Sequence, residues 1–149
     1  MAKILVVDDT PVLLDLVREA LEDAGHEVRT CVFSRQALKM AAEFLPDVVI
    51  LDVIMPEVSG WEILDQLRSS RETSELPVIV CTAWAESAAG HLRQRQDPYA
   101  WLLTKPFNRD ELIELVDEAL ARLWEWPKRA AQGERFDRLR TGSVEPATL

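Results

Sequence analysis

The stretch Ile4-Leu5-Val6-Val7-Asp8-Asp9 decides the fold. Four consecutive apolar residues predict a short strand buried on both faces, which is typical of a parallel sheet. The next two residues, Thr10 as N-cap and Pro11 at the first helical position, predict that a helix begins directly after the aspartates. The chain therefore opens with a strand–helix unit, the repeating element of parallel α/β folds.

The same alternation of strand and helix continues along the chain. Four more strands are predicted, at 28–32, 48–51, 77–81 and 101–103. A helical spacing of apolar residues follows each strand, with Ser34 as the expected N-cap of the second helix and Asn108 with Glu111 as a capping box for the last. Five such units in about 125 residues predict a flavodoxin-like, doubly wound (βα)5 domain with a five-stranded parallel sheet.

The length of 149 residues suits one domain and one core. We expect a domain over residues 1–126 and a tail over 127–149, because large apolar residues become sparse beyond that boundary. The tail is interpreted either as disordered or as a short helix over 130–139 that docks on a partner through Phe136 and Leu139. About 22 residues are too few for a DNA-binding domain.

Composition excludes several classes of partner. A net charge of −9 and a pI near 4.7 argue against binding to nucleic acid or to an anionic membrane. No apolar stretch is long enough to span a bilayer, and the N-terminus lacks the layout of a signal peptide. Cys31 and Cys81 lie inside apolar runs, where thiols behave as small buried hydrophobes. We therefore expect a cytoplasmic protein that binds neither nucleic acid nor membranes.

Polar residues whose side chains could take part in binding or catalysis lie at the ends of four predicted strands. They are Asp8, Asp9, Asp52, Thr82 and Lys105. In a doubly wound sheet the carboxyl ends of the strands form the functional crevice, so these side chains should converge. Three close carboxylates repel one another unless a cation such as Mg²⁺ binds them. The ammonium and the hydroxyl would neutralise and hydrogen-bond a phosphoryl group, so the sequence predicts a Mg²⁺ site that is open to phosphate.

This constellation resembles the receiver domain of bacterial two-component response regulators. The matching motifs are 4–9, 49–56 with Gly60, 80–83 and 103–107, and the resemblance covers about residues 2–125. The resemblance implies the following roles: Asp52 as phosphoacceptor, Asp8 and Asp9 as Mg²⁺ ligands with Asp52 and the Ile54 carbonyl, Thr82 with Ala83 as the switch position, and Lys105 in contact with the phosphoryl group.

The resemblance also implies a function. Such a domain accepts a phosphoryl group from the phosphohistidine of a sensor histidine kinase or a histidine phosphotransfer protein. It then signals to a downstream protein through a changed face made by the fourth helix, the last strand and the fifth helix, and the same face is a candidate for homodimer formation. A receiver of this kind is not an enzyme in the usual sense, since it catalyses only its own phosphorylation and slow dephosphorylation.

Two features depart from the family pattern. Receivers commonly carry Tyr or Phe three positions before the lysine, where this chain has Leu102. We interpret Leu102 as a core residue, with Trp101 or Tyr99 as the alternative partner of the switch hydroxyl. Ile54 and Trp84 should flank the phosphoryl group, and because both are bulky and apolar they should hold a hydrolytic water poorly. A long-lived aspartyl phosphate is expected.

Several aromatic residues are expected on or near the side of the fourth and fifth helices: Trp84, Tyr99, Trp101, Trp124 and Trp126. If two or more of them are exposed, they form a recognition or dimer surface.

Three other functions compete with the receiver interpretation. A phosphatase that forms an aspartyl phosphate would usually carry a general acid at the position of Ile54. A flavodoxin would need a loop rich in Ser, Thr and Gly where this chain has two aspartates, and the aspartates would repel a flavin phosphate. A phosphate-independent scaffold with the receiver fold remains open.

Overall fold

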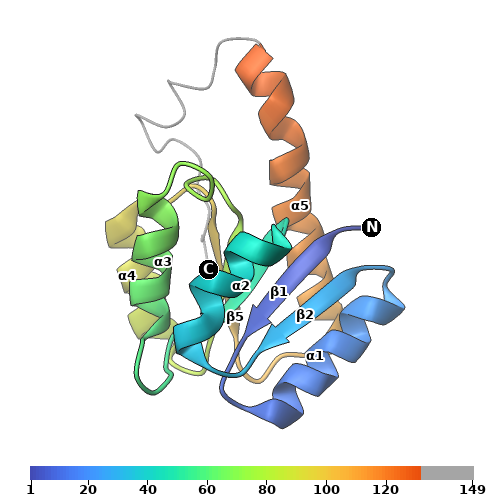
Figure 1. Ribbon diagram of the computed structural model, residues 1–149, viewed down its shortest axis with the longest axis vertical. Helices are drawn as coiled ribbons and strands as arrows, with labels where there is room; N and C mark the ends of the chain where they lie inside the picture. The colour runs from blue at the N-terminus through green and yellow to red at the C-terminus, as the bar shows by residue number, and fades with distance from the viewer. Residues whose placement is uncertain (132–149) are drawn as a thin grey trace.

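Within the residues that a computed structural model describes, the protein forms a single parallel sheet (Figure 1). The structure describes the backbone of residues 1–131 and the side chains of residues 1–122. The five strands are β1 (Lys3–Val7), β2 (Glu27–Cys31), β3 (Val48–Asp52), β4 (Val78–Thr82) and β5 (Ala100–Thr104). Their spatial order is β2-β1-β3-β4-β5, and every neighbouring pair is parallel. The predicted flavodoxin-like (βα)5 fold is confirmed.

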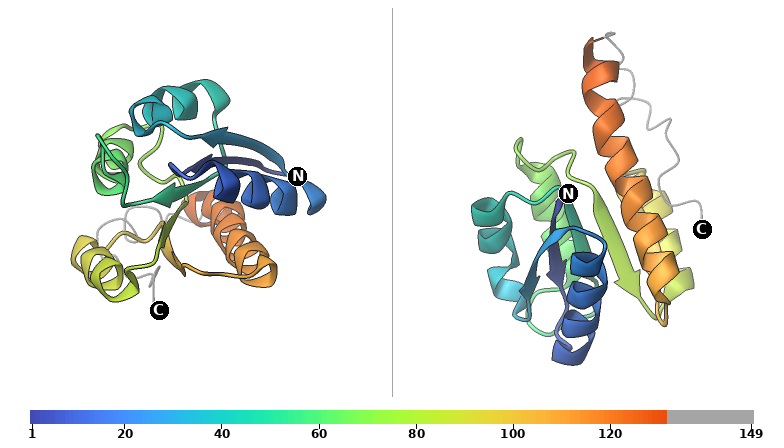
Figure 2. Two further views of the ribbon diagram at one scale, coloured as in Figure 1. Left: turned by 90° about the horizontal axis from the view of Figure 1, so that it is seen from below. Right: turned by 90° about the vertical axis from the view of Figure 1, so that its right-hand side faces the viewer.

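Helices cover both faces of the sheet. They are α1 (Pro11–Asp23), α2 (Ala37–Phe44) preceded by the short 3₁₀ turn η1 (Ser34–Gln36), α3 (Gly60–Ser69), α4 (Ala85–Arg95) and α5 (Arg109–Ala131). Helices α1 and α5 pack on one face and α2, α3 and α4 on the other, as the end-on view in Figure 2 shows. Each connection crosses over one face, which is how parallel neighbours must be joined.

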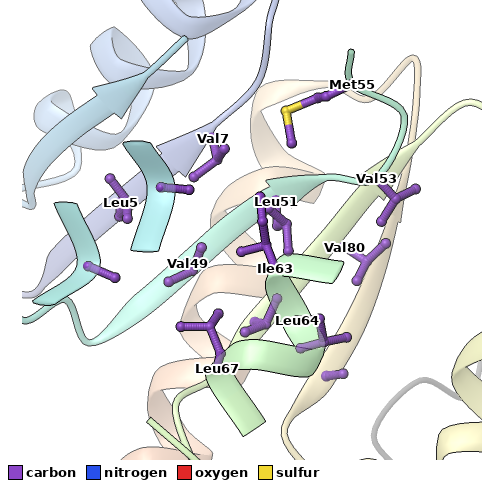
Figure 3. Close-up of a cluster of buried hydrophobic side chains, with 14 of the residues drawn as sticks. Leu5, Val7, Val49, Leu51, Val53, Met55, Ile63, Leu64, Leu67 and Val80 are labelled. Carbon is purple, nitrogen blue, oxygen red and sulfur yellow. The ribbon is translucent and has the colours of Figure 1, made fainter. Parts of the chain in front are cut away.

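The sheet separates two apolar cores, because successive side chains of a strand point to opposite faces. In β1, Leu5 and Val7 face α2, α3 and α4, whereas Ile4 and Val6 face α1 and α5. Figure 3 shows the first of these cores, where β1, β3 and β4 pack against α3. Burial on both faces explains why these strands are uninterrupted apolar runs in the sequence.

The predicted helix caps had different outcomes. Asn108 caps α5, since its Oδ1 accepts the N–H of Glu111 at 2.8 Å. Thr10 occupies the N-cap of α1 without a side-chain cap bond. The expectation that Ser34 caps the second helix is wrong: α2 begins at Ala37. The hydroxyl of Ser34 is buried and is engaged by the loop after β3 instead.

Helix α5 runs across the expected boundary at position 127 and ends at Ala131. Its last turns project beyond the sheet (Figure 1). The proposed tail helix, with Phe136 and Leu139, lies outside the residues that the structure describes.

An arginine ties several segments together at the amino ends of the strands. The Nε of Arg68, in α3, donates to Asp97 Oδ2 at 2.6 Å. The other guanidinium nitrogens donate to the carbonyls of Thr73 at 3.0 Å and Tyr99 at 3.1 Å. At the other end of α3, the ring of Trp61 stacks on the ring of His91 in α4, with centroids 4.0 Å apart. These contacts hold the C-terminal half of α4 against α3.

In the part of the chain that the structure describes, no helix combines the length and apolar character needed to cross a membrane.

Candidate phosphoryl and metal site

Four strands deliver polar side chains to one crevice. Asp8 follows β1, Asp52 ends β3, Thr82 ends β4 and Lys105 follows β5, so all four lie at the carboxyl ends of their strands. The strand order reverses between β1 and β3, and a doubly wound sheet opens its binding crevice at this point. The topology therefore places Asp8 and Asp52 on the two sides of the opening.

The three aspartates form a compact cluster. One carboxylate oxygen from each of Asp8, Asp9 and Asp52 lies within 4.8 Å of the others. Asp8 and Asp52 are buried, whereas Asp9 is exposed. Lys105 Nζ lies 2.8 Å from Asp8 Oδ2 and 3.6 Å from Asp52 Oδ2.

The donor set of this cluster fits a divalent cation. A single ammonium group cannot balance three carboxylates, and the surplus of negative charge is partly shielded from water. Carboxylate oxygens together with water are the ligands that Mg²⁺ prefers. Asp8, Asp9 and Asp52 could therefore hold a metal ion at the exposed side of the cluster, next to Asp9.

Backbone hydrogen bonds fix the orientation of the two buried carboxylates. Asp8 Oδ1 accepts the N–H of Thr10 at 2.9 Å, and Asp52 Oδ1 accepts the N–H of Ile54 at 3.1 Å. Both are bonds from an aspartate to the backbone two residues later, the local turn that this residue type favours. In each aspartate the second oxygen, Oδ2, is the one nearest Lys105.

Burial raises the pKa of Asp52 above its ordinary value. The N–H of Ile54 and the charge of Lys105 act against this rise, and the negative charges of Asp8 and Asp9 add to it. For Lys105, burial alone would lower the pKa, but the hydrogen bond to Asp8 and the charge of Asp52 outweigh burial and raise it. Lys105 therefore stays cationic beside the carboxylates.

The loop from Val53 to Ser59 begins with side chains that point alternately inward and outward. Val53 and Met55 are buried and reach into the core shown in Figure 3, whereas Ile54 between them is 54% exposed. Gly60 closes the loop, because its N–H donates to the Val53 carbonyl at 3.2 Å. A Cβ at Gly60 would lie 2.3 Å from the carbonyl oxygen of Asp52. The glycine therefore permits the close approach of α3 to the end of β3.

Thr82 connects the crevice to the start of α4. Its side chain is buried, and its Oγ1 accepts the N–H of Trp84 at 3.0 Å. Ala83 is exposed, and Trp84 is 68% exposed. Trp84 and Ile54 line a groove of about 400 Å³ that adjoins Thr82 and extends to Trp61. The two apolar side chains expected beside the phosphoryl group thus stand on the rim of the crevice.

The structure places the aromatic residues of the last strand away from Thr82. Leu102 is buried in the core beneath α2, α3 and α4, whereas Trp101 points to the opposite face of the sheet. Tyr99 precedes β5 at the amino end of the sheet, where its hydroxyl donates to Glu75 Oε2 at 2.8 Å. Neither aromatic ring lies where it could move together with the hydroxyl of Thr82.

The expected aromatic surface is only partly described. Trp84 is exposed, Tyr99 and Trp101 are buried, and the side chains of Trp124 and Trp126 lie outside the description. Among the members of this set whose side chains the structure describes, Trp84 alone is exposed, so they do not meet the condition of two exposed aromatics.

The fold and the grouping of these residues define a signalling domain of the receiver type. A family profile described as response regulator receiver domain matches residues 4–117, and the chain belongs to this family. Receiver domains of response regulators are signalling proteins and not conventional enzymes.

Similar proteins include both stand-alone receivers and longer regulators. PilH of Pseudomonas aeruginosa is 33% identical over 121 residues, covering 81% of this chain and 99% of PilH. The "DNA-binding dual master transcriptional regulator RpaA" of Synechocystis is 32% identical over 136 residues, covering 90% of this chain but 55% of RpaA. Among solved structures, the chemotaxis protein CheY4 of Vibrio cholerae superimposes with a TM-score of 0.74 at 32% identity, covering 80% of this chain and 99% of that protein.

Proposed function

We propose that this receiver domain accepts a phosphoryl group on Asp52 from the phosphohistidine of a sensor histidine kinase or a histidine phosphotransfer protein. The observation that carries the proposal is the convergence of Asp8, Asp9 and Asp52 with Lys105 at the switch point of the sheet. Mg²⁺ would be held by the three carboxylates and the backbone carbonyl of Ile54. When bound, it would neutralise charge on the transferring phosphoryl oxygens.

The residues of the crevice have separable tasks in this transfer. A carboxylate oxygen of Asp52 attacks phosphorus, the P–N bond to the donor imidazole breaks, and the electron pair stays on the imidazole nitrogen. The N–H of Ile54 holds Asp52 Oδ1, so that the carboxylate keeps one orientation during attack. The ammonium of Lys105 stabilises the negative charge that reaches the crevice with the phosphoryl group.

Phosphorylation would be transmitted through Thr82. Its Oγ1 now accepts the N–H of Trp84, the residue that precedes α4. A phosphoryl group on Asp52 would attract the hydroxyl of Thr82, and this attraction competes with the bond to Trp84. The start of α4 would then rearrange, which changes the α4-β5-α5 surface presented to a downstream protein or to a second copy of this chain.

We place the protein in the cytoplasm, because the two free, buried thiols of Cys31 and Cys81 suit a reducing compartment.

The side chain at position 54 is apolar and exposed, so it offers no acid for hydrolytic turnover. This favours a signalling switch over the phosphatase alternative.

The test is labelling with acetyl phosphate in the presence of Mg²⁺. We expect Asp52→Asn to abolish labelling and chelation of divalent cations to suppress it. Asp15→Asn, the same change at an exposed carboxylate of α1 paired with Arg18, should label like the wild-type protein. Undiminished labelling of Asp52→Asn would refute Asp52 as acceptor, and a wild-type protein that never labels would leave the scaffold as the better function.

A further inference from the structure

The loop between β3 and α3 contains a strained turn. Glu57 has a φ of +71°, a region that residues with a side chain rarely adopt. On either side of it, the N–H of Val58 donates to the carbonyl of Pro56 at 2.9 Å. A hydrogen bond between residues two apart around a positive φ is the strained form of the γ-turn. Such a conformation persists only where surrounding contacts enforce it.

One side chain from the segment between β2 and α2 forms hydrogen bonds with both backbone groups that close this turn. The hydroxyl of Ser34 donates to the carbonyl of Pro56 at 2.9 Å, and the same oxygen accepts the N–H of Val58 at 3.2 Å. Ser34 lies 22 and 24 residues from these partners and is 6% exposed. Because the hydroxyl is buried, its bonds are not readily replaced by water.

A second contact joins the same two segments, the one between β2 and α2 and the one between β3 and α3, but it is weaker. Arg35 Nε lies 3.0 Å from Glu57 Oε2, but both side chains are more than half exposed. Exposed ion pairs of this kind contribute little. The buried hydroxyl of Ser34 is therefore the main link that holds the turn.

We propose that Ser34 is a positioning residue for the Mg²⁺ site, because it fixes the turn at Pro56–Val58 and thereby the backbone of Ile54. This inference rests on the proposed function, in which the Ile54 carbonyl binds Mg²⁺. Ile54 lies between two fixed points of the loop: its N–H bonds to Asp52, and Pro56 follows two residues later. Without Ser34 the turn relaxes, and the Ile54 carbonyl loses its preset direction.

The experiment measures the Mg²⁺ dissociation constant of the unphosphorylated protein by titrating tryptophan fluorescence, to which Trp61 and Trp84 beside the site contribute. Ser34→Ala removes both hydrogen bonds of the hydroxyl, and we expect it to weaken Mg²⁺ binding about threefold to tenfold, which is comparable to the net contribution of a single hydrogen bond because the loss acts on Mg²⁺ only through the backbone of Ile54. Adding Glu57→Gly to this variant should recover part of the affinity, because glycine adopts positive φ without strain. Ser34→Cys keeps a weak donor of similar size and should give an intermediate affinity.

A matched control separates positioning from a general loss of stability. Ser59→Ala removes a hydroxyl from the same loop, where it caps α3 by accepting the N–H of Glu62. We expect this change to lower stability and to leave Mg²⁺ affinity within twofold of the wild type. Equal weakening by Ser59→Ala, unchanged affinity in Ser34→Ala, or no recovery with Glu57→Gly would each overturn the role of Ser34. A wild-type protein that binds no Mg²⁺ would instead overturn the proposed function.

Discussion

Replacing Gly60 with alanine should damage both the stability of the protein and the geometry of Asp52, the proposed phosphoacceptor. The added Cβ would lie 2.3 Å from the carbonyl oxygen of Asp52 and 2.5 Å from the Cα of Val53. Cβ atoms essentially never approach another atom within 3.0 Å, so α3 and the end of β3 must separate by about 0.7 Å. The obstructing atoms belong to the backbone and cannot rotate away as a flexible side chain would.

The size of the effect follows from this geometry. Forcing extra atoms into a packed site typically costs about 1–3 kcal/mol. Alanine recovers up to about 1 kcal/mol of helix propensity at a helical position. We therefore expect Gly60→Ala to lower the free energy of unfolding by about 2 kcal/mol, measured as a fall in the urea midpoint at an unchanged slope.

The same displacement moves Asp52 relative to Lys105 and the other carboxylates. A misplacement of about 1 Å at a reacting group can slow a reaction roughly 100-fold. Labelling of Gly60→Ala by acetyl phosphate should accordingly be slower by about tenfold or more, at a temperature where the variant is fully folded.

Gly90, in the middle of α4, provides the control. A Cβ there would have only the Nη2 of Arg93 nearby, at 3.8 Å. Gly90→Ala should therefore raise the free energy of unfolding by about 0.5–1 kcal/mol through helix propensity and leave the labelling rate unchanged. If Gly60→Ala proved as stable as Gly90→Ala, or were labelled at the wild-type rate, the close approach at Gly60 would not constrain the site.

Other properties can be measured independently. The aspartyl phosphate should be long-lived, and the double change Ile54→Asn with Trp84→Gln should speed the loss of label about tenfold by giving water hydrogen-bond partners at the rim; equal decay in both proteins would contradict this. Burial raises the pKa of Cys81 to about 12 and also raises the pKa of Cys31, so neither thiol should react with a disulfide reagent at pH 8 until the protein is unfolded; fast modification of the folded protein would argue otherwise. Burial and the N-terminal charge lower the pKa of His26 below 6.5. The contribution of His26 to the free energy of unfolding should therefore be complete above about pH 6.5 and should be lost as the pH falls through the lowered pKa. His26→Asn should remove this pH-dependent contribution from urea midpoints measured between pH 7.5 and 5.

The sequence was sufficient to predict the order of the elements and the residues of the crevice. Strands buried on both faces are uninterrupted apolar runs, and their ends are marked by the first polar residue. Asp8, Asp52 and Thr82 therefore stand out without any knowledge of packing, and Lys105 directly follows Thr104, the first polar residue at the end of β5. Their convergence follows from the rule that parallel strands present their carboxyl ends at one edge.

Contacts between loops that lie far apart in the sequence could not be predicted in the same way. A serine after a strand and before a helical pattern looks like an N-cap, and only the fold shows that Ser34 bonds to a turn more than twenty residues away. The positive φ of Glu57 has no sequence signal either, because glycine or asparagine would normally mark such a turn. The direction of Trp101 depends on strand register, since a shift of one residue reverses its face.

The contacts of Arg68 make the two ends of α4 unequal. Its bond to Asp97, just after α4, holds the C-terminal end of the helix to α3. The N-terminal end depends on the hydrogen bond between Thr82 and an exposed tryptophan. A rearrangement that starts at Asp52, the proposed phosphoacceptor, would thus tilt α4 about its fixed C-terminal end. The displacement should be greatest on the surface next to Trp84 and should decline toward Arg95, so a partner that senses the signal would gain most by contacting the first turn of this helix.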